Sequence, residues 1–110
     1  MVDIRISPRA QKDMLEIREY ISEELSNPTA AANVLSIITK RIRELAEFPL
    51  MGAPLSSIID LETGYRFLVC GQYTAFYRYE DGTVYVDRVL YGRRGFVRIL
   101  FGDIADEEGR

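Results

Sequence analysis

Three arginines lie close together near the end of the chain, at Arg93, Arg94 and Arg98. Arginine stays charged at physiological pH, and its planar guanidinium presents paired donors that fit a phosphate or a carboxylate. Tyr91 and Phe96 add aromatic rings that can stack on bases or on guanidinium groups. These residue types at this spacing predict a contact surface for an anionic partner. The alternative is a solvated surface whose arginines pair with acidic helices of the same chain.

The chain is acidic overall, with a formal net charge of −3 at pH 7, so its total charge does not reveal this local excess of arginine. Residues 63–101 nevertheless hold six arginines and no lysine against three acidic residues, and residues 103–110 hold four acidic residues against one arginine. Solvated surfaces usually mix the two cations, so an arginine-only segment favours a functional role. Arg66 and Arg88 lie in the same segment and are further candidates for the contact surface.

Few groups in the sequence could perform acid–base or metal chemistry. The chain has no histidine, which excludes a Cys–His pair, and only one cysteine, Cys70, which excludes an internal disulfide. Its only lysines, Lys12 and Lys40, fall in predicted helices. The sequence has no metal-ligand spacing and no glycine-rich phosphate loop. We expect no metal and no cofactor, and we assign no catalytic residue.

Two helices and a sheet must position the arginines. Residues 2–6 alternate between apolar and polar, as a short strand does. Ser7-Pro8 and Asn27-Pro28 each combine a capping residue with proline at the first helical position. Apolar residues then recur every three or four positions, from 10 to 25 and from 31 to 45. With a connection this short, the two helices should form an antiparallel hairpin.

From residue 63 the apolar period changes to two, and segments 63–70, 72–80 and 83–91 predict three antiparallel strands. Between the last two, Asp81-Gly82 favours a two-residue turn. That turn pairs Tyr79 with Val84, Tyr77 with Val86 and Ala75 with Arg88. A tight turn at Gly71-Gln72 sets Arg66 opposite Tyr77.

Both faces of this sheet carry apolar side chains, so both should be partly covered. One face holds Leu68, Tyr73, Tyr77, Val86 and Leu90 with Arg66 and Arg88. The other holds Phe67, Val69, Phe76, Tyr85 and Val89 with Arg78 and Asp87. The pattern leaves open which face packs on the helices and which meets a partner. Residues 93–101 fit either a short helix or a final strand, and residues 49–62 read as a loop.

The elements together predict an α+β fold, with an N-terminal short strand and an antiparallel helix hairpin packed on a C-terminal antiparallel β-sheet. A length of 110 residues suits a single domain, which we place at residues 1–102, followed by an acidic, flexible tail at 103–110. No apolar run reaches the ~18 residues that a membrane span requires. The N-terminus lacks the pattern of a secretory signal. We therefore expect a cytoplasmic protein with no membrane partner.

This order of elements resembles the RelE/ParE superfamily of type II toxin–antitoxin toxins. The motifs that carry the resemblance are Tyr65-Arg66, Y-x-x-FYR at 73–78, V-x-RVLYGRR at 86–94 and the apolar close at 99–101. The resemblance covers nearly the whole chain. It implies a partner, a cognate antitoxin whose disordered segment folds along the toxin.

The resemblance implies two activities. ParE-like members poison DNA gyrase by stabilising its cleaved-DNA state, whereas RelE-like members are ribosome-dependent endoribonucleases that cut mRNA. Arg94 matches a phosphate-binding arginine of the nuclease members. Leu100 stands where those members often have tyrosine, Thr74 where they often have a basic residue, and Gly95 where many relatives have aspartate.

The poor set of acid–base groups makes us favour a ParE-like gyrase inhibitor. A RelE-like nuclease and a non-toxic partner-binding module are the alternatives. The predicted target-binding residues are Arg93, Arg94, Arg98, Tyr91, Arg66 and Arg88.

Overall fold

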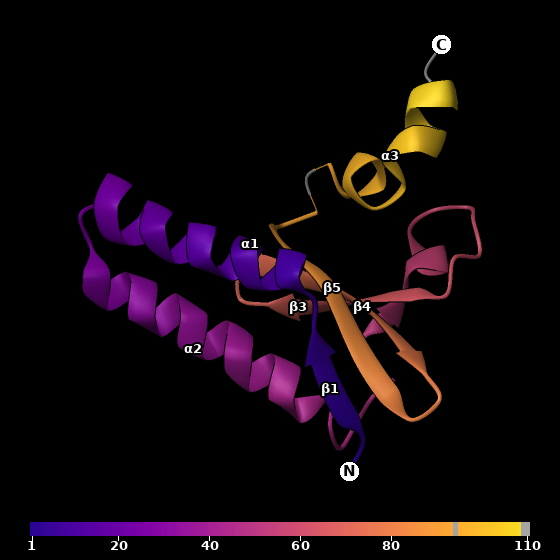
Figure 1. Cartoon of the computed structure of the whole chain (residues 1–110), viewed down its shortest axis with the longest axis horizontal. Helices are drawn as coiled ribbons and strands as arrows, with labels where there is room; N and C mark the ends of the chain where they lie inside the picture. The colour runs from indigo at the N-terminus through magenta and orange to yellow at the C-terminus, as the bar shows by residue number, and fades with distance from the viewer. Residues whose placement is uncertain (94, 109–110) are drawn as a thin grey trace.

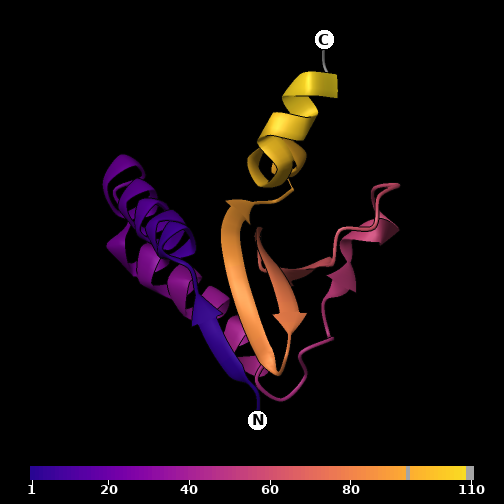
Figure 2. The same ribbon diagram turned by 45° about the vertical axis from the view of Figure 1, so that its right-hand side comes forward.

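The computed structural model describes residues 1–93 and 95–108, with side chains for 1–93 and 95–102. Two long helices lie side by side against one face of a sheet, and a third helix follows the last strand (Figures 1 and 2). The elements in chain order are β1 (Asp3–Ile6), α1 (Pro8–Glu19), the π-helical turn η1 (Tyr20–Glu24), α2 (Pro28–Glu44), β2 (Ala53–Pro54), the 3-10 turn η2 (Leu55–Ser57), β3 (Tyr65–Cys70), β4 (Tyr73–Glu80), β5 (Thr83–Tyr91) and α3 (Phe96–Glu108).

The sheet has five strands in the order β1-β5-β4-β3-β2. Strands β3, β4 and β5 form the predicted antiparallel meander. The N-terminal strand β1 joins one edge parallel to β5, and the short β2 joins the other edge antiparallel to β3. The α+β class is confirmed, with a mixed sheet in place of a purely antiparallel one. Residues 49–62, predicted to be a loop, contribute β2 and η2.

Both predicted helix starts are confirmed. The Ser7 hydroxyl accepts a hydrogen bond from the Ala10 amide at 2.9 Å, and the Asn27 side chain accepts one from the Ala30 amide at 3.1 Å. Pro8 and Pro28 occupy the beginning of the helices, where no intrahelical partner exists for an amide anyway.

The first helix departs from the prediction at its far end, where the α-helix stops at Glu19 and a π turn follows. In this turn the Leu25 amide donates to the Tyr20 carbonyl at 3.2 Å. A π turn holds more residues per turn than an α-helix, so it moves later side chains off the apolar stripe. Leu25, predicted to belong to that stripe, is accordingly 56% exposed.

The core lies between the helix hairpin and the sheet face predicted from Leu68, Tyr77 and Val86. Its helix side chains come from both members of the hairpin, and its sheet side chains come from β3, β4 and β5. The buried cluster comprises Ala10, Ile38, Ile42, Leu45, Leu68, Cys70, Ala75, Tyr77, Val84, Val86 and Val89.

The predicted register holds near the hairpin turn and fails beyond it. Tyr79 opposes Val84 and Tyr77 opposes Val86, but a register shift between Phe76 and Tyr77 leaves one extra residue in β5. That extra residue is Asp87. The predicted pairing of Arg66 with Tyr77 is confirmed.

Because of this β-bulge, Ala75 opposes Val89 and not Arg88, so that predicted pair is wrong. A bulge also changes which side chains beyond it face the core. Val89, which the uninterrupted alternation placed on the other face, is buried in the core. The same alternation put Leu90 and Arg88 on the core face, and this assignment fails for the same reason.

The helix α3 settles the choice left open for residues 93–101 and contacts the sheet face opposite the hairpin. Phe96 stacks on Phe76 with ring centroids 5.5 Å apart, and Phe101 meets Tyr65 edge-on at 5.7 Å. The backbone of Phe101 is non-helical, so α3 is kinked there. The domain limit at residue 102 and the flexible tail stay predictions, and residues 109–110 of that tail lie outside the described residues. None of the described helices has the length and apolar character that crossing a bilayer requires.

Gly52, which precedes β2, packs closely against Phe67 of β3 and Tyr77 of β4. Its amide donates to the Tyr77 hydroxyl at 3.1 Å, and that hydroxyl donates to the Pro49 carbonyl at 2.8 Å. A Cβ at this position would lie 2.6 Å from the Phe67 carbonyl oxygen and 2.7 Å from the Tyr77 hydroxyl. There is no room for a methyl group without moving backbone.

We therefore predict that Gly52→Ala lowers the free energy of unfolding by about 1–3 kcal/mol, the usual cost of overpacking. Urea denaturation measures this change. Gly102→Ala, whose Cβ would meet open space, is the matched control. Equal stability of the two variants would contradict the packing described here.

Candidate target-contact site

Arg88, one of the predicted contact residues, is engaged inside the fold. Its Nε and Nη2 donate to the two carboxylate oxygens of Asp13 at 2.7 and 2.9 Å. Asp13 is 6% exposed and also accepts a hydrogen bond from the Val89 amide at 3.0 Å. This bidentate pair joins α1 to β5, so the structure gives Arg88 a fold-supporting role.

Arg66 is similarly engaged with backbone. Its Nε donates to the Gly52 carbonyl at 3.0 Å, and its Nη2 donates to the carbonyls of Gly52 and Leu50 at 2.6 and 3.0 Å. These bonds tie the segment that leads into β2 onto β3. Arg66 and Arg88 thus both present their guanidinium groups to the protein itself.

The cluster at the end of the chain is spread over more than one side of the sheet. Arg93 is exposed, and its guanidinium lies over the Phe67 ring at 5.7 Å from the centroid, on the face opposite the hairpin. Arg98 is exposed on α3. Tyr91 turns toward the helix side, where its ring meets Tyr73 edge-on at 5.5 Å. Arg94 lies outside the described residues, so its position is not assigned.

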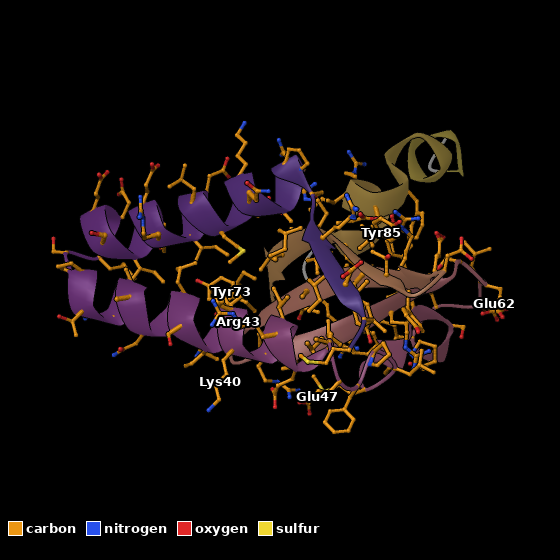
Figure 3. The ribbon with its side chains drawn as sticks, turned by 60° about the horizontal axis from the view of Figure 1, so that its bottom comes forward. Lys40, Arg43, Glu47, Glu62, Tyr73 and Tyr85 are labelled. Carbon is orange, nitrogen blue, oxygen red and sulfur yellow. The ribbon has the colours of Figure 1, made fainter. Side chains whose placement is uncertain are left out.

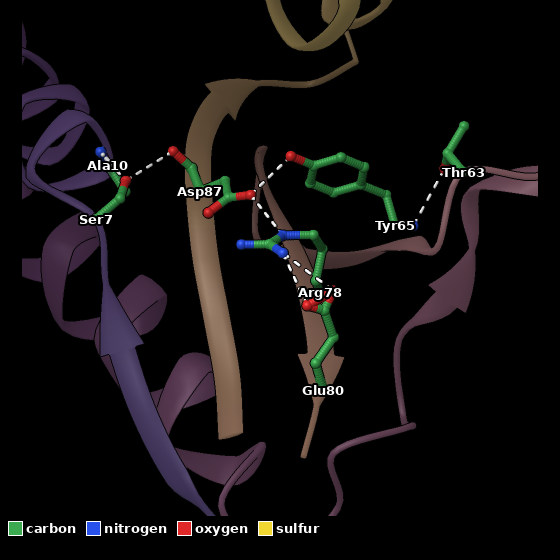
Figure 4. Close-up of polar contacts among 7 residues, drawn as sticks. All are labelled: Ser7, Ala10, Thr63, Tyr65, Arg78, Glu80 and Asp87. Carbon is green, nitrogen blue, oxygen red and sulfur yellow. Dashed lines mark hydrogen bonds and ion pairs between the residues drawn. The ribbon is translucent and has the colours of Figure 1, made fainter. Parts of the chain in front are cut away.

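A polar network on the face opposite the hairpin was not selected from the sequence (Figure 4). Asp87, the bulge residue, accepts hydrogen bonds at one carboxylate oxygen from the Tyr65 hydroxyl at 2.7 Å and from Arg78 Nε at 3.0 Å. Arg78 also pairs with Glu80 at 2.9 Å. Its guanidinium lies over the Tyr85 ring at 5.1 Å from the centroid. The signal that could have found this network is the placement of Arg78 and Asp87 on one predicted face.

The network is arranged for charge and contact, not for proton exchange near neutral pH. Burial raises the pKa of Tyr65 to about 12, and the hydrogen bond to Asp87 and its negative charge add to the effect. The hydrogen bond to Asp87 also raises the pKa of Arg78. Burial raises the pKa of the Cys70 thiol to about 11, so the unreactive thiol form dominates at pH 7.

The described side chains offer no cluster of three or more Cys, Asp and Glu that could hold a metal ion. On the face opposite the hairpin, Arg78 gives its Nε and Nη1 donors to Asp87 and Glu80. Arg93 lies over the Phe67 ring, and a guanidinium held over an aromatic ring keeps its outward donors for a phosphate or a carboxylate. Among the described residues of this face, Arg93 is therefore the one suited to contact an anion.

Two solved structures resemble this architecture. A chain of the chromosomal ParDE TA system from P. aeruginosa has a TM-score of 0.70 and 19% identity, covering 84% of this chain and 97% of that one. A chain of the toxin–antitoxin complex RelBE2 from Mycobacterium tuberculosis has a TM-score of 0.61 and 22% identity, covering 82% and 96%. At these identities the likeness establishes a fold of the RelE/ParE type.

The sequence gives the narrower assignment. Residues 4–96 match the family model of the ParE toxin of the type II toxin–antitoxin system parDE. The chain therefore belongs to the ParE toxin family. This confirms the predicted membership of the RelE/ParE superfamily and the prediction that the chain is more similar to ParE than to RelE. No curated protein matches the sequence.

The ion pair between Asp13 and Arg88 leads to a prediction about the stability of variants that lack one partner. Removing one partner leaves the other charge buried and uncompensated, which typically costs about 3–5 kcal/mol. We expect Arg88→Ala and Asp13→Ala each to lose about 3 kcal/mol, and the double variant to lose clearly less than their sum. Denaturant titration of the three variants measures the coupling. Additive losses, or losses no larger than those of the exposed control Arg9→Ala, would contradict the assigned role of the pair.

The shifted pKa of Tyr65 predicts a change of stability in alkali. An unfolded tyrosine ionises near pH 10, before the folded Tyr65 at about 12. The unfolded state therefore loses its proton first, and the stabilisation is complete below pH 10 and declines between pH 10 and 12. Tyr65→Phe should make the fall of stability over this range less steep. Identical slopes for variant and wild type, in denaturant titrations at several pH values, would refute the shift.

Proposed function

We propose that this ParE-family chain acts as the toxin of a type II toxin–antitoxin pair, and that it inhibits growth by poisoning DNA gyrase through contacts alone. One observation supports the proposal that the chain inhibits gyrase through contacts alone. On the face opposite the hairpin, the Arg93 guanidinium lies over the Phe67 ring, while burial and the neighbouring Asp87 raise the pKa of the partly buried Tyr65 to about 12. The match to the ParE family model supports the same choice.

Acid–base catalysis of RNA cleavage works best with groups whose pKa lies near the operating pH. Tyr65, with a pKa of about 12, and the arginines do not meet this condition. Binding requires only donors in the right place, which the exposed Arg93 and Arg98 supply. The inhibitor would then act by holding gyrase and its cleaved DNA in one arrangement.

A cognate antitoxin is the second partner in this proposal. Both similar solved structures come from toxin–antitoxin systems or complexes. The surface of this chain also exposes large apolar side chains at widely separated points, among them Leu25, Leu61 and Val69. Exposed apolar area of this kind suits a partner that wraps around the chain.

The proposal is tested by incubating the purified chain with gyrase and supercoiled DNA, and separately with translating ribosomes. We predict that linear DNA accumulates in the first reaction and that mRNA stays intact in the second. Cut mRNA without linear DNA would favour the endoribonuclease alternative. No effect in either reaction, with antitoxin binding retained, would favour the non-toxic binding module.

The arginines are tested with charge-matched variants in the same gyrase reaction. Arg93→Ala combined with Arg98→Ala should lose most of the linear DNA, and Arg94→Ala should do the same. Arg94→Lys should restore little, because an ammonium group cannot reproduce bidentate binding. Arg5→Ala combined with Arg9→Ala removes the same charge from exposed positions elsewhere and should behave like wild type. Full activity of the Arg93/Arg98 variant would refute the contact surface.

A further inference from the structure

The helix hairpin extends beyond the sheet (Figure 1). A groove lies between the far end of the hairpin and the adjacent ends of two strands. Strand β4 begins at Tyr73 and β5 ends at Tyr91, while the hairpin continues through η1 into the start of α2. The groove that results has a volume of about 730 Å³. Its walls include Glu16, Tyr20, Leu25, Val34, Tyr73 and Tyr91. It lies on the helix side of the sheet, away from Phe67 and Arg93.

Three tyrosines from three different elements meet in this groove. Tyr73 reaches from the sheet toward the two helices (Figure 3), and its ring meets that of Tyr91 edge-on at 5.5 Å. Tyr20 adds a third ring from η1. Tyr20 and Tyr91 are 55% and 53% exposed. Exposed aromatic rings grouped in a hollow are the usual anchors of a protein interface.

The helix wall of the groove carries one uncompensated carboxylate. The acidic side chains that line the groove are Asp13 and Glu16. Asp13 is neutralised by Arg88, whereas Glu16 forms no ion pair with any described side chain. Aromatic faces beside an uncompensated carboxylate attract a cation, as in the cages that bind ammonium groups.

The π turn supplies the apolar part of the same surface. The turn at Tyr20–Glu24 moves Leu25 away from the core to the rim of the groove. Val34 of α2 faces the same hollow and is only partly buried. Single π turns inside helices are uncommon and occur frequently at functional sites. The groove thus combines tyrosine rings beside the Glu16 carboxylate with an apolar wall.

We propose that this groove is the docking site for a basic, amphipathic segment of the antitoxin. An arginine or lysine of that segment enters among Tyr20, Tyr73 and Tyr91 with Glu16 beside it, and its apolar side chains lie on Leu25 and Val34. The proposal rests on the proposed antitoxin partner. An acidic segment would meet Glu16 with like charge, and a purely apolar one would bury that carboxylate without a partner.

The test measures antitoxin affinity by calorimetry, with the full chain and its full-length cognate antitoxin. Glu16→Lys combined with Tyr20→Ala should weaken binding about tenfold or more, as the loss of an interface anchor does. The matched control is Glu47→Lys combined with Phe48→Ala, which makes the same charge change and also removes an aromatic ring, at exposed positions that follow the end of α2. Thermal midpoints within a few degrees of wild type confirm that each variant folds.

The outcomes separate this inference from the proposed function. Normal binding by the Glu16/Tyr20 variant overturns the groove while the antitoxin partner stands. An equal loss in the Glu47/Phe48 control also overturns it, because the effect is then not specific to the groove. If the wild-type chain does not bind antitoxin at all, the partner and the groove both fail. A homodimer that Glu16→Lys dissociates would assign the groove to a second copy of the chain and contradict the proposal.

Discussion

The carboxylate of Asp13 accepts a hydrogen bond from the edge of β5, beyond the point where the neighbouring strand β1 ends. Strand β1 pairs with β5 only as far as Val86. Beyond it, the Ser7 hydroxyl donates to the Asp87 carbonyl at 2.9 Å, and Asp13 accepts from the Val89 amide at 3.0 Å. A buried amide without a partner costs about 1–3 kcal/mol. The first turns of α1 therefore complete the hydrogen bonding of the strand, and this fixes the hairpin on the sheet.

The arrangement of the arginines follows from that contact and from the bulge beside it. The bulge places Asp87 on the face opposite the hairpin, where it holds Arg78 and Tyr65. It also brings Arg88 to Asp13 and Val89 into the core. A chain rich in one cation thus uses part of its arginine internally. The proposed contact with a target therefore rests on the end of the segment, where Arg93 is exposed over the Phe67 ring.

The features that could be predicted from the sequence are those determined by residues close together in the chain. The two cap-and-proline starts and the Asp81-Gly82 turn are encoded within a few residues, and the structure forms all three. The bulge was missed because its stabilising contact joins Asp13 to Arg88 and Val89, about 75 residues along the chain. The roles of Arg66 and Arg88 were missed for the same reason, since their partners are distant in sequence. A pattern of charges cannot tell a guanidinium facing solvent from one facing a carbonyl.

The proposed docking groove and the proposed arginine contact surface lie on opposite faces of the sheet, so an antitoxin and a target would bind at separate places. Both depend on the hairpin being held in one place by Asp13. Native-state hydrogen exchange of the Val89 amide tests this most directly. If Asp13 holds that amide, it should exchange only when the protein unfolds globally, as slowly as the core amides of β4. Exchange from the folded state, at the rate of a solvent-facing strand edge, would contradict the claim.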